Sequence, residues 1–128
     1  MIPRAVTADE LDQYLPVIAW HLGKFCENGQ WEPQDLIDQI RDRQRQLRLI
    51  EGKCVLLTSV LTDRLSTVQV THCVGVDYQE WLPLWPLIER WAKEIGAKRI
   101  EIVARPGWEW PMRQFGLTKT HVVLEKRL

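Results

Sequence analysis

The stretch WLPLWPLIERWAKEIG, residues 81–96, carries the most regular pattern of the chain and decides its fold. Its apolar residues recur at i, i+3, i+4 and i+7, which predicts an amphipathic helix over residues 79–95. Gly96 is expected to end this helix. Pro86 is expected to mark where regular helix begins, after an irregular turn.

The residues that follow predict a strand, a turn and a second strand. Residues 99–104, RIEIVA, alternate in character as a half-buried strand does. The segment Arg105-Pro106-Gly107-Trp108 predicts a turn, and about one helical turn then leads to Gly116. The chain is expected to close with a strand near residues 118–126.

The first third of the chain predicts helices. Thr7-Ala8-Asp9-Glu10 has the spacing of a capping box, which starts a helix whose regular pattern Pro16 should kink or split. A second helix is expected from Pro33, because proline suits a first helical turn.

Three apolar segments in the middle of the chain predict strands. Residues 47–50 and 54–61 flank a short turn and predict a hairpin, and residues 67–76 predict a third strand. A helical third followed by the order β-β-β-α-β-α-β predicts an α/β three-layer domain. We expect one domain over residues 1–128, with a mixed central sheet and helices on both faces.

Composition excludes several classes of protein. The chain has 17 basic and 17 acidic residues, for a net charge of zero, which argues against a nucleic-acid binder. No apolar run approaches the ~20 residues that a membrane span needs, and no signal peptide is expected. Cys26, Cys54 and Cys73 lack zinc spacing and predict reduced thiols, so we expect a cytoplasmic protein without a metal site.

Five short motifs lie in these elements: QLRLI (46–50), IERWA (88–92), GAKRIEI (96–102), RPGW (105–108) and FGL (115–117). Together they resemble the GCN5-related N-acetyltransferase (GNAT) family, in particular the short, divergent GNAT-like proteins that tailed bacteriophages often encode. The resemblance implies a GNAT-like fold, an acetyltransferase-like site, and a viral protein of the host cytoplasm or the virion.

The resemblance also implies where acetyl-CoA would bind, after the strand at 67–76. GNAT enzymes carry a Q/R-x-x-G-x-G/A loop there, where glycines and free helix N–H groups accept the diphosphate. Here Gly75 is followed by no other glycine until Gly96, no Arg or Lys is nearby in sequence, and Asp77 and Glu80 add negative charge. If a cofactor binds, the backbone around these residues is expected to hold it: Val74, Gly75, Val76 and Tyr78.

The sequence also offers a few candidate catalytic residues. Met112 stands where GNAT enzymes often carry a tyrosine as general acid, and it cannot donate a proton. His72 lies in a strand and could act as a base, although a structural histidine is the commoner case. Glu101 and Arg105 bracket the strand at 99–104 and could face a cleft at its end, with a solvated or ion-paired Glu101 as the alternative.

Aromatic and arginine residues suggest surfaces. Of Trp108 and Trp110, one is expected in the core and the other exposed as a protein contact or a cleft wall. Four arginines lie close together in the sequence and predict a solvated helix face: Arg41, Arg43, Arg45 and Arg48.

Two functions therefore remain open. The first is a phage-encoded, non-enzymatic protein with a structural or host-interaction role, a degenerate acetyl-CoA loop, and a protein partner or a second copy as its ligand. The second is an acetyl-CoA-dependent N-acetyltransferase, an acyltransferase that acts on an amine of a small molecule or a protein. Neither requires another cofactor, a nucleic acid or a membrane.

Overall fold

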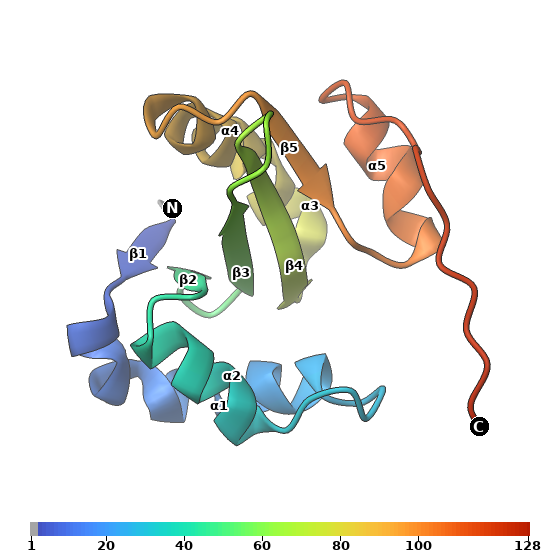
Figure 1. Cartoon of the computed structure of the whole chain (residues 1–128). Coiled ribbons are helices and arrows are strands. Elements are labelled where there is room, and N and C mark those ends of the chain that lie inside the picture. The colour runs from blue at the N-terminus through green and yellow to red at the C-terminus, as the bar shows by residue number, and fades with distance from the viewer. Residues whose placement is uncertain (1–2) are drawn as a thin grey trace.

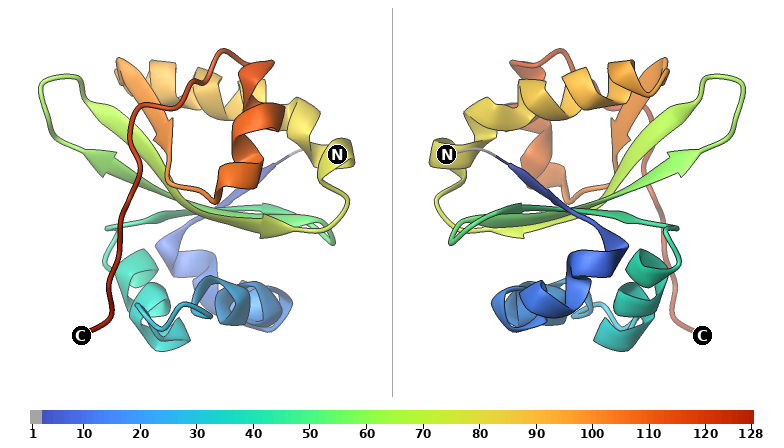
Figure 2. Two further views of the ribbon diagram at one scale, coloured as in Figure 1. Left: turned by 90° about the vertical axis from the view of Figure 1, so that its right-hand side faces the viewer. Right: turned by 90° about the vertical axis from the view of Figure 1, so that its left-hand side faces the viewer.

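A five-stranded sheet lies between two helical layers in the computed structural model, which describes residues 3–128 (Figures 1 and 2). The strands are β1 (Arg4–Val6), β2 (Gln46–Ile50), β3 (Cys54–Leu61), β4 (Thr67–Gly75) and β5 (Arg99–Ile102). The α-helices are α1 (Leu11–Phe25), α2 (Pro33–Arg41), α3 (Tyr78–Trp81), α4 (Trp85–Glu94) and α5 (Glu109–Arg113). Short 3-10 helices are η1 (Ala8–Glu10), η2 (Leu82–Leu84) and η3 (Pro106–Trp108). The predicted α/β class with a mixed sheet is confirmed.

The strands lie side by side in chain order, from β1 at one edge to β5 at the other. Neighbours from β1 to β4 are antiparallel, whereas β4 and β5 are parallel. A parallel pair needs a long crossover, which the α3–α4 segment supplies. The sequence did not predict β1, because three residues are too short to show a period.

Helices α1 and α2 cover one face of the sheet. The predicted capping box is present: the Glu10 backbone N–H donates to Thr7 Oγ1 at 3.3 Å, and the Thr7 backbone N–H donates to Glu10 Oε1 at 3.4 Å. Of the two outcomes predicted for Pro16, the split into two helices is wrong, because α1 runs unbroken through it. Pro16 removes only one backbone donor near the start of the helix, and the buried Leu11 and Ile18 anchor both sides.

Helices α3, α4 and α5 cover the opposite face (Figure 2). Regular helix begins at Trp85 after the 3-10 turn that contains Pro83, which confirms the predicted role of Pro86 in the first turn of α4. Trp85, Ile88 and Ala92 form the buried stripe of α4.

Each layer closes its own apolar core against the sheet. The core under α1 and α2 contains Val6, Leu11, Ile18, Leu22, Phe25, Leu36, Ile40, Leu47, Leu49, Val55 and Leu57. The core under α3, α4 and α5 contains Ile50, Cys54, Leu56, Val70, Trp81, Leu82, Trp85, Ile88 and Met112. We call them the lower core and the upper core. The three cysteines are free thiols, as expected.

The predicted final strand near residues 118–126 is wrong. Residues 117–128 form neither helix nor strand, and the segment runs away from α5 past the sheet (Figures 1 and 2). Its apolar residues face solvent, with Val122 67%, Val123 84% and Leu124 91% exposed. A strand requires a partner, and no strand of residues 3–128 pairs with this segment.

The arginine-rich segment is not one solvated helix face, because α2 ends at Arg41. Arg48 lies in β2 with its guanidinium 3.6 Å from the centroid of the Trp91 ring, and burial lowers its pKa to about 10. Arg45 is also half-buried, and burial lowers its pKa. Arg41 and Arg43 are exposed as predicted.

Neither a membrane-spanning helix nor a metal-binding cluster is found in the described part of the chain. Over residues 3–128, no helix combines the length and the apolar character that crossing a bilayer requires. The same residues contain no cluster of three His, Cys, Asp or Glu side chains that could hold a metal ion.

Candidate functional site

Strands β4 and β5 pair at one end and part at the other, and we call the point where they separate the fork. Their parallel register joins Thr67–Val70 to Arg99–Ile102. The last rung is the bond from Val103 N–H to the Val70 carbonyl at 3.0 Å. Beyond it, β4 continues to Gly75 without β5 beside it.

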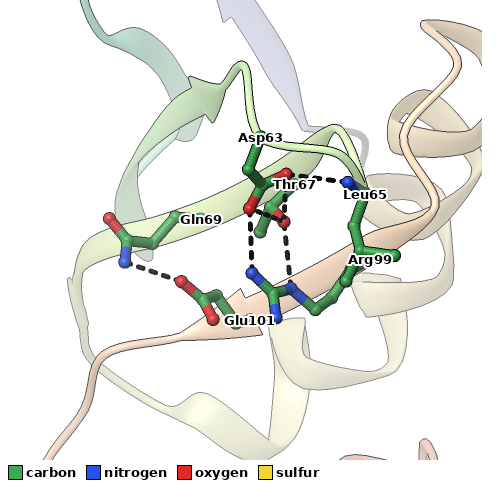
Figure 3. A network of polar contacts seen from close by, with 6 residues as sticks. All are labelled: Asp63, Leu65, Thr67, Gln69, Arg99 and Glu101. Carbon is green, nitrogen blue, oxygen red and sulfur yellow. Dashed lines mark hydrogen bonds and ion pairs between the residues drawn. The ribbon is translucent and has the colours of Figure 1, made fainter.

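A polar network holds the closed end of the fork (Figure 3). Asp63 accepts hydrogen bonds from the Thr67 hydroxyl at 2.9 Å, from Arg99 at 3.0 Å and from the Leu65 backbone at 3.1 Å. The Arg99 Nε–H donates to Thr67 Oγ1 at 2.9 Å. Desolvation would raise the pKa of Asp63, but Thr67, Arg99 and the backbone N–H groups together lower it. This network fixes where β5 begins beside β4.

A β-bulge lies where the fork opens. The β3–β4 register pairs Leu57 with His72 but Thr58 with Val70, so Thr71 is an extra residue in β4. The Thr71 hydroxyl donates to the Leu57 carbonyl at 3.4 Å and accepts from Arg45 at 2.6 Å. Bulges bend a strand and redirect its side chains.

The bulge places His72 over the lower core. Its ring lies 5.0 Å from the Phe25 ring, and its Nδ1 is 2.9 Å from Thr71 Oγ1. Burial, and secondarily the charge of Arg45, lower the pKa of His72 to about 4. The imidazole is therefore neutral at pH 7, and it is a weak base.

The other two candidate catalytic residues lie apart from His72. Glu101 is half-buried in β5 and accepts a hydrogen bond from Gln69 Nε2 at 2.8 Å (Figure 3). Arg105 is exposed beyond the end of β5 and precedes η3. Glu101 thus has a polar partner of its own, and no hydrogen bond within the described residues joins these three side chains.

The candidate cofactor residues form the end of β4 and the start of α3. A Cβ on Gly75 would lie 2.3 Å from the Lys53 carbonyl oxygen, so a close approach of two backbones requires this glycine. Val76 N–H donates to that same carbonyl at 2.7 Å. Val74 packs against the lower core, and Tyr78 is 43% exposed.

A cation lies near this loop in space, although no Arg or Lys is close to it in sequence. Lys53, in the turn between β2 and β3, places its Nζ 3.0 Å from Asp77 and 2.8 Å from Glu80. These hydrogen bonds, with Glu80 first, raise the pKa of Lys53. Asp77 itself has a left-handed backbone, with φ of 53°. The hairpin register could have revealed this contact, since Cys54 lies opposite Gly75.

Aromatic rings join η3 to α3 on the upper face. Trp108 lies 5.8 Å from Trp81 and 6.1 Å from Tyr78, measured between ring centroids. The Trp81 indole N–H donates to the Val76 carbonyl at 2.9 Å. Trp108 packs against the upper core, whereas Trp110 is 78% exposed, which confirms the predicted division between the two.

The general-acid position is also part of this packing. Met112 is only 4% exposed and belongs to the upper core. Sequence reasoning missed Thr71 and assigned Arg45 to a solvated helix face, whereas these two residues contact each other at the bulge. An extra residue in a strand produces no recognisable pattern in the sequence, so only the pairing register between the strands reveals it.

The whole chain superposes on solved acetyltransferase structures. A probable acetyltransferase matches with a TM-score of 0.72 at 13% identity, over 100% of this chain and 97% of that one. Ribosomal-protein-alanine N-acetyltransferase from Brucella melitensis biovar Abortus 2308 matches with a TM-score of 0.70 at 12% identity, over 100% of both chains. Aminoglycoside N-acetyltransferase AAC(6')-Iy in complex with CoA matches with a TM-score of 0.69 at 11% identity, over 98% and 93%.

These similarities establish that the chain has the GNAT acetyltransferase fold, which confirms the fold expected from the sequence motifs. At such low identity they concern the fold alone. No family model matches the chain, and no curated protein matches it either. The resemblance to phage proteins stays a prediction.

Proposed function

We propose that this protein is a non-catalytic, protein-binding member of the GNAT fold, with a structural or host-interaction role of the phage type. The observation that carries the proposal is the ion-paired start of α3, where Lys53 bonds both Asp77 and Glu80. The phage setting rests on the resemblance of the short sequence motifs between residues 46 and 117.

Charge is the main argument against a CoA diphosphate at α3. An arriving diphosphate would meet two carboxylates and a single ammonium that already bonds both of them. If Lys53 turned to the diphosphate, Asp77 and Glu80 would lose their counter-charge and repel the ligand. The four residues of α3 also offer only a short helix to bind an anion.

The proton-transfer groups give a second argument. Met112 is buried and carries no transferable proton. His72 has a pKa near 4, so it is a poor base for removing a proton from an ammonium group. Efficient acid–base catalysis favours groups that titrate near the working pH.

Exposed apolar side chains supply a surface for a protein partner. Trp110 is 78% exposed, Val103 54% and Val76 47%. Tryptophan is enriched among the residues that dominate binding energy in interfaces. These side chains therefore support an interaction role.

Calorimetric titration with acetyl-CoA tests the proposal. We expect no heat of binding for the native chain, and weak binding at most for the double variant Asp77→Asn/Glu80→Gln, which removes the repulsion. The matched control is Asp42→Asn/Glu94→Gln, which makes the same charge change at two other exposed carboxylates. Micromolar binding by the native chain would overturn the proposal.

A second candidate is acetyl-CoA-dependent N-acetyl transfer to an amine. The fork and the bulge at Thr71 favour it, since they leave the end of β4 without a neighbouring strand. Solved proteins of this fold bind CoA or acetyl-CoA, which adds support. The test is an assay for release of the CoA thiol in the presence of amines. If His72 is the base of this reaction, the variant His72→Gln should lose the activity.

A further inference from the structure

The C-terminal tail, residues 118–128, has the character of a strand but no partner. Its sequence TKTHVVLEKRL combines β-branched and apolar residues in the middle with charges at the end. Val122, Val123 and Leu124 are among the most exposed apolar residues that the structure describes. Three adjacent apolar side chains in water indicate a missing contact.

The outer edge of strand β5 has unpaired backbone groups to which such a segment could bind. It pairs with β4 on one side, and within residues 3–128 no strand pairs with its other side. Such an edge presents a row of backbone donors and acceptors that can bind another extended segment. Val103, directly after β5, is 54% exposed at this edge.

We propose that the tail of one copy pairs antiparallel with β5 of a second copy, and that the exchange is reciprocal, which gives a two-fold symmetric dimer. Each copy then donates one strand and accepts one, so both edges are covered. This inference deepens the proposed interaction role by naming a partner, and it depends on the tail and β5 rather than on acetyl-CoA binding.

The side chains favour one register. Ile100 and Ile102 pack against the upper core, so the residues opposite them should be apolar and two apart in sequence. Leu124 opposite Ile100 and Val122 opposite Ile102 meet that condition. The same register places Glu125 opposite Arg99, which adds a favourable pair of opposite charges.

The path of the chain explains why the partner is a second copy. Residues 103–117 connect β5 to the tail, and Met112 and Trp108 in this connection pack against the upper core. The tail therefore starts away from its own β5, and Figure 1 shows it running at a distance from that strand. Near its end, the Arg127 guanidinium donates a hydrogen bond to the Asn28 carbonyl in the α1–α2 loop at 2.5 Å.

Exchange costs little in the monomer. The contact between Arg127 and Asn28 is exposed, and an exposed hydrogen bond contributes little net stability. The apolar residues 122–124 have almost no burial to lose. Association therefore adds contacts without first breaking a core.

Cysteine cross-linking distinguishes pairing between copies from pairing within one. In the proposed register Glu101 lies opposite Val123, so we mix the single variants Glu101→Cys and Val123→Cys and oxidise them. A cross-linked heterodimer on a non-reducing gel is the expected result, because only exchange between copies can form it. The native chain and each single variant alone are controls for Cys26, Cys54 and Cys73. A double variant that cross-links only within one chain would overturn the proposal.

Analytical ultracentrifugation of the full chain gives an independent test. We expect a dimer, and Leu124→Asp should weaken it roughly tenfold or more because a charge replaces a leucine that would be buried. Leu124 is 91% exposed in the monomer, so the variant should fold normally. Leu128→Asp is the matched control, since it changes the same tail beyond the paired residues. A native chain that stays monomeric at the highest attainable concentration would overturn the proposal, whatever the outcome with acetyl-CoA.

Discussion

The two ends of the fork differ in how β4 is held. At the closed end, β4 has strands on both sides, and the buried Thr67 joins Asp63 and Arg99 in one network. At the open end, β4 keeps only β3, and it contains the bulge, a neutral half-buried histidine and a glycine required by packing. One strand thus combines a section fixed by charge and pairing with a section fixed by shape and burial. The second section should respond most strongly to small changes in volume or protonation.

The largest effect is expected from Gly75→Ala at the open end. The new Cβ would lie 2.3 Å from the Lys53 carbonyl oxygen, so the β2–β3 turn or β4 must shift. We expect a loss of about 3 kcal/mol in the free energy of unfolding, measured by urea denaturation. Gly107→Ala is the control, because nothing lies within 4 Å of its added carbon. Equal stability of the two variants would refute a packing role for Gly75.

The second effect concerns protonation of His72. Its pKa is lowered from 6.5 to about 4 in the folded chain, so the unfolded chain binds a proton first as pH falls. The stabilisation from keeping His72 neutral is complete above pH 6.5 and decreases as pH falls toward 4. The full shift corresponds to about 3 kcal/mol, and partial exposure of the ring reduces this to roughly 2 kcal/mol.

Comparison with His72→Gln isolates this contribution. Between about pH 7 and pH 4.5, the native chain should lose roughly 2 kcal/mol more stability than the variant, measured by denaturant unfolding at each pH. Carboxylate titrations occur in both proteins and cancel in the difference. Parallel pH profiles would show that the histidine is not protonated selectively in the unfolded state.

A smaller effect is expected at the closed end from Thr67→Val. Valine preserves the shape but removes the hydroxyl that bonds both Asp63 and Arg99. We expect a loss of about 1 kcal/mol, because exposed Asp63 and Arg99 can bond water instead. Thermal unfolding measures it, with the exposed Thr62→Val as control. A loss as large as that of Gly75→Ala would mean that the network, rather than shape, dominates the stability of the strand.

The smallest effect on stability is expected from Lys53→Gln. This removes two ion pairs with the exposed Asp77 and Glu80, and exposed ion pairs contribute little to stability. The melting temperature should stay unchanged, since the Val76 bond to the Lys53 backbone remains. A clear fall in the melting temperature would contradict this and would show that the ion pairs hold the start of α3 in place.

Most of the fold could be predicted from local periods. The stripe Trp85, Ile88 and Ala92 defines α4, and the apolar runs define β3 and β4. The tail could not be predicted in the same way, because HVVL has a strand-like composition and pairing is a non-local event. Pro16 was misjudged for a related reason, since burial on both sides of it outweighs one missing backbone bond.

The candidate site was less predictable than the fold. Its sequence neighbours suggested an unpaired acidic loop, but Lys53 reaches Asp77 and Glu80 from a turn more than twenty residues earlier. His72 was found because histidine is chemically conspicuous, whereas its low pKa depends on burial against Phe25 and on Arg45. Such contacts depend on register, which composition does not reveal.

The extra residue at Thr71 bends β4 without exchanging the faces of the residues that follow it. Val70 and Cys73 face the upper core, whereas His72 and Val74 face the lower core, so the alternation resets at this one residue. Deleting Thr71 would leave a simple alternation in which each later side chain keeps its present helical layer, and it would remove the bend together with the Thr71 bonds to Leu57 and Arg45. Deleting Cys73 instead would turn Val74 toward the opposite layer, so natural variation in the residue count of β4 should occur at Thr71 rather than after it.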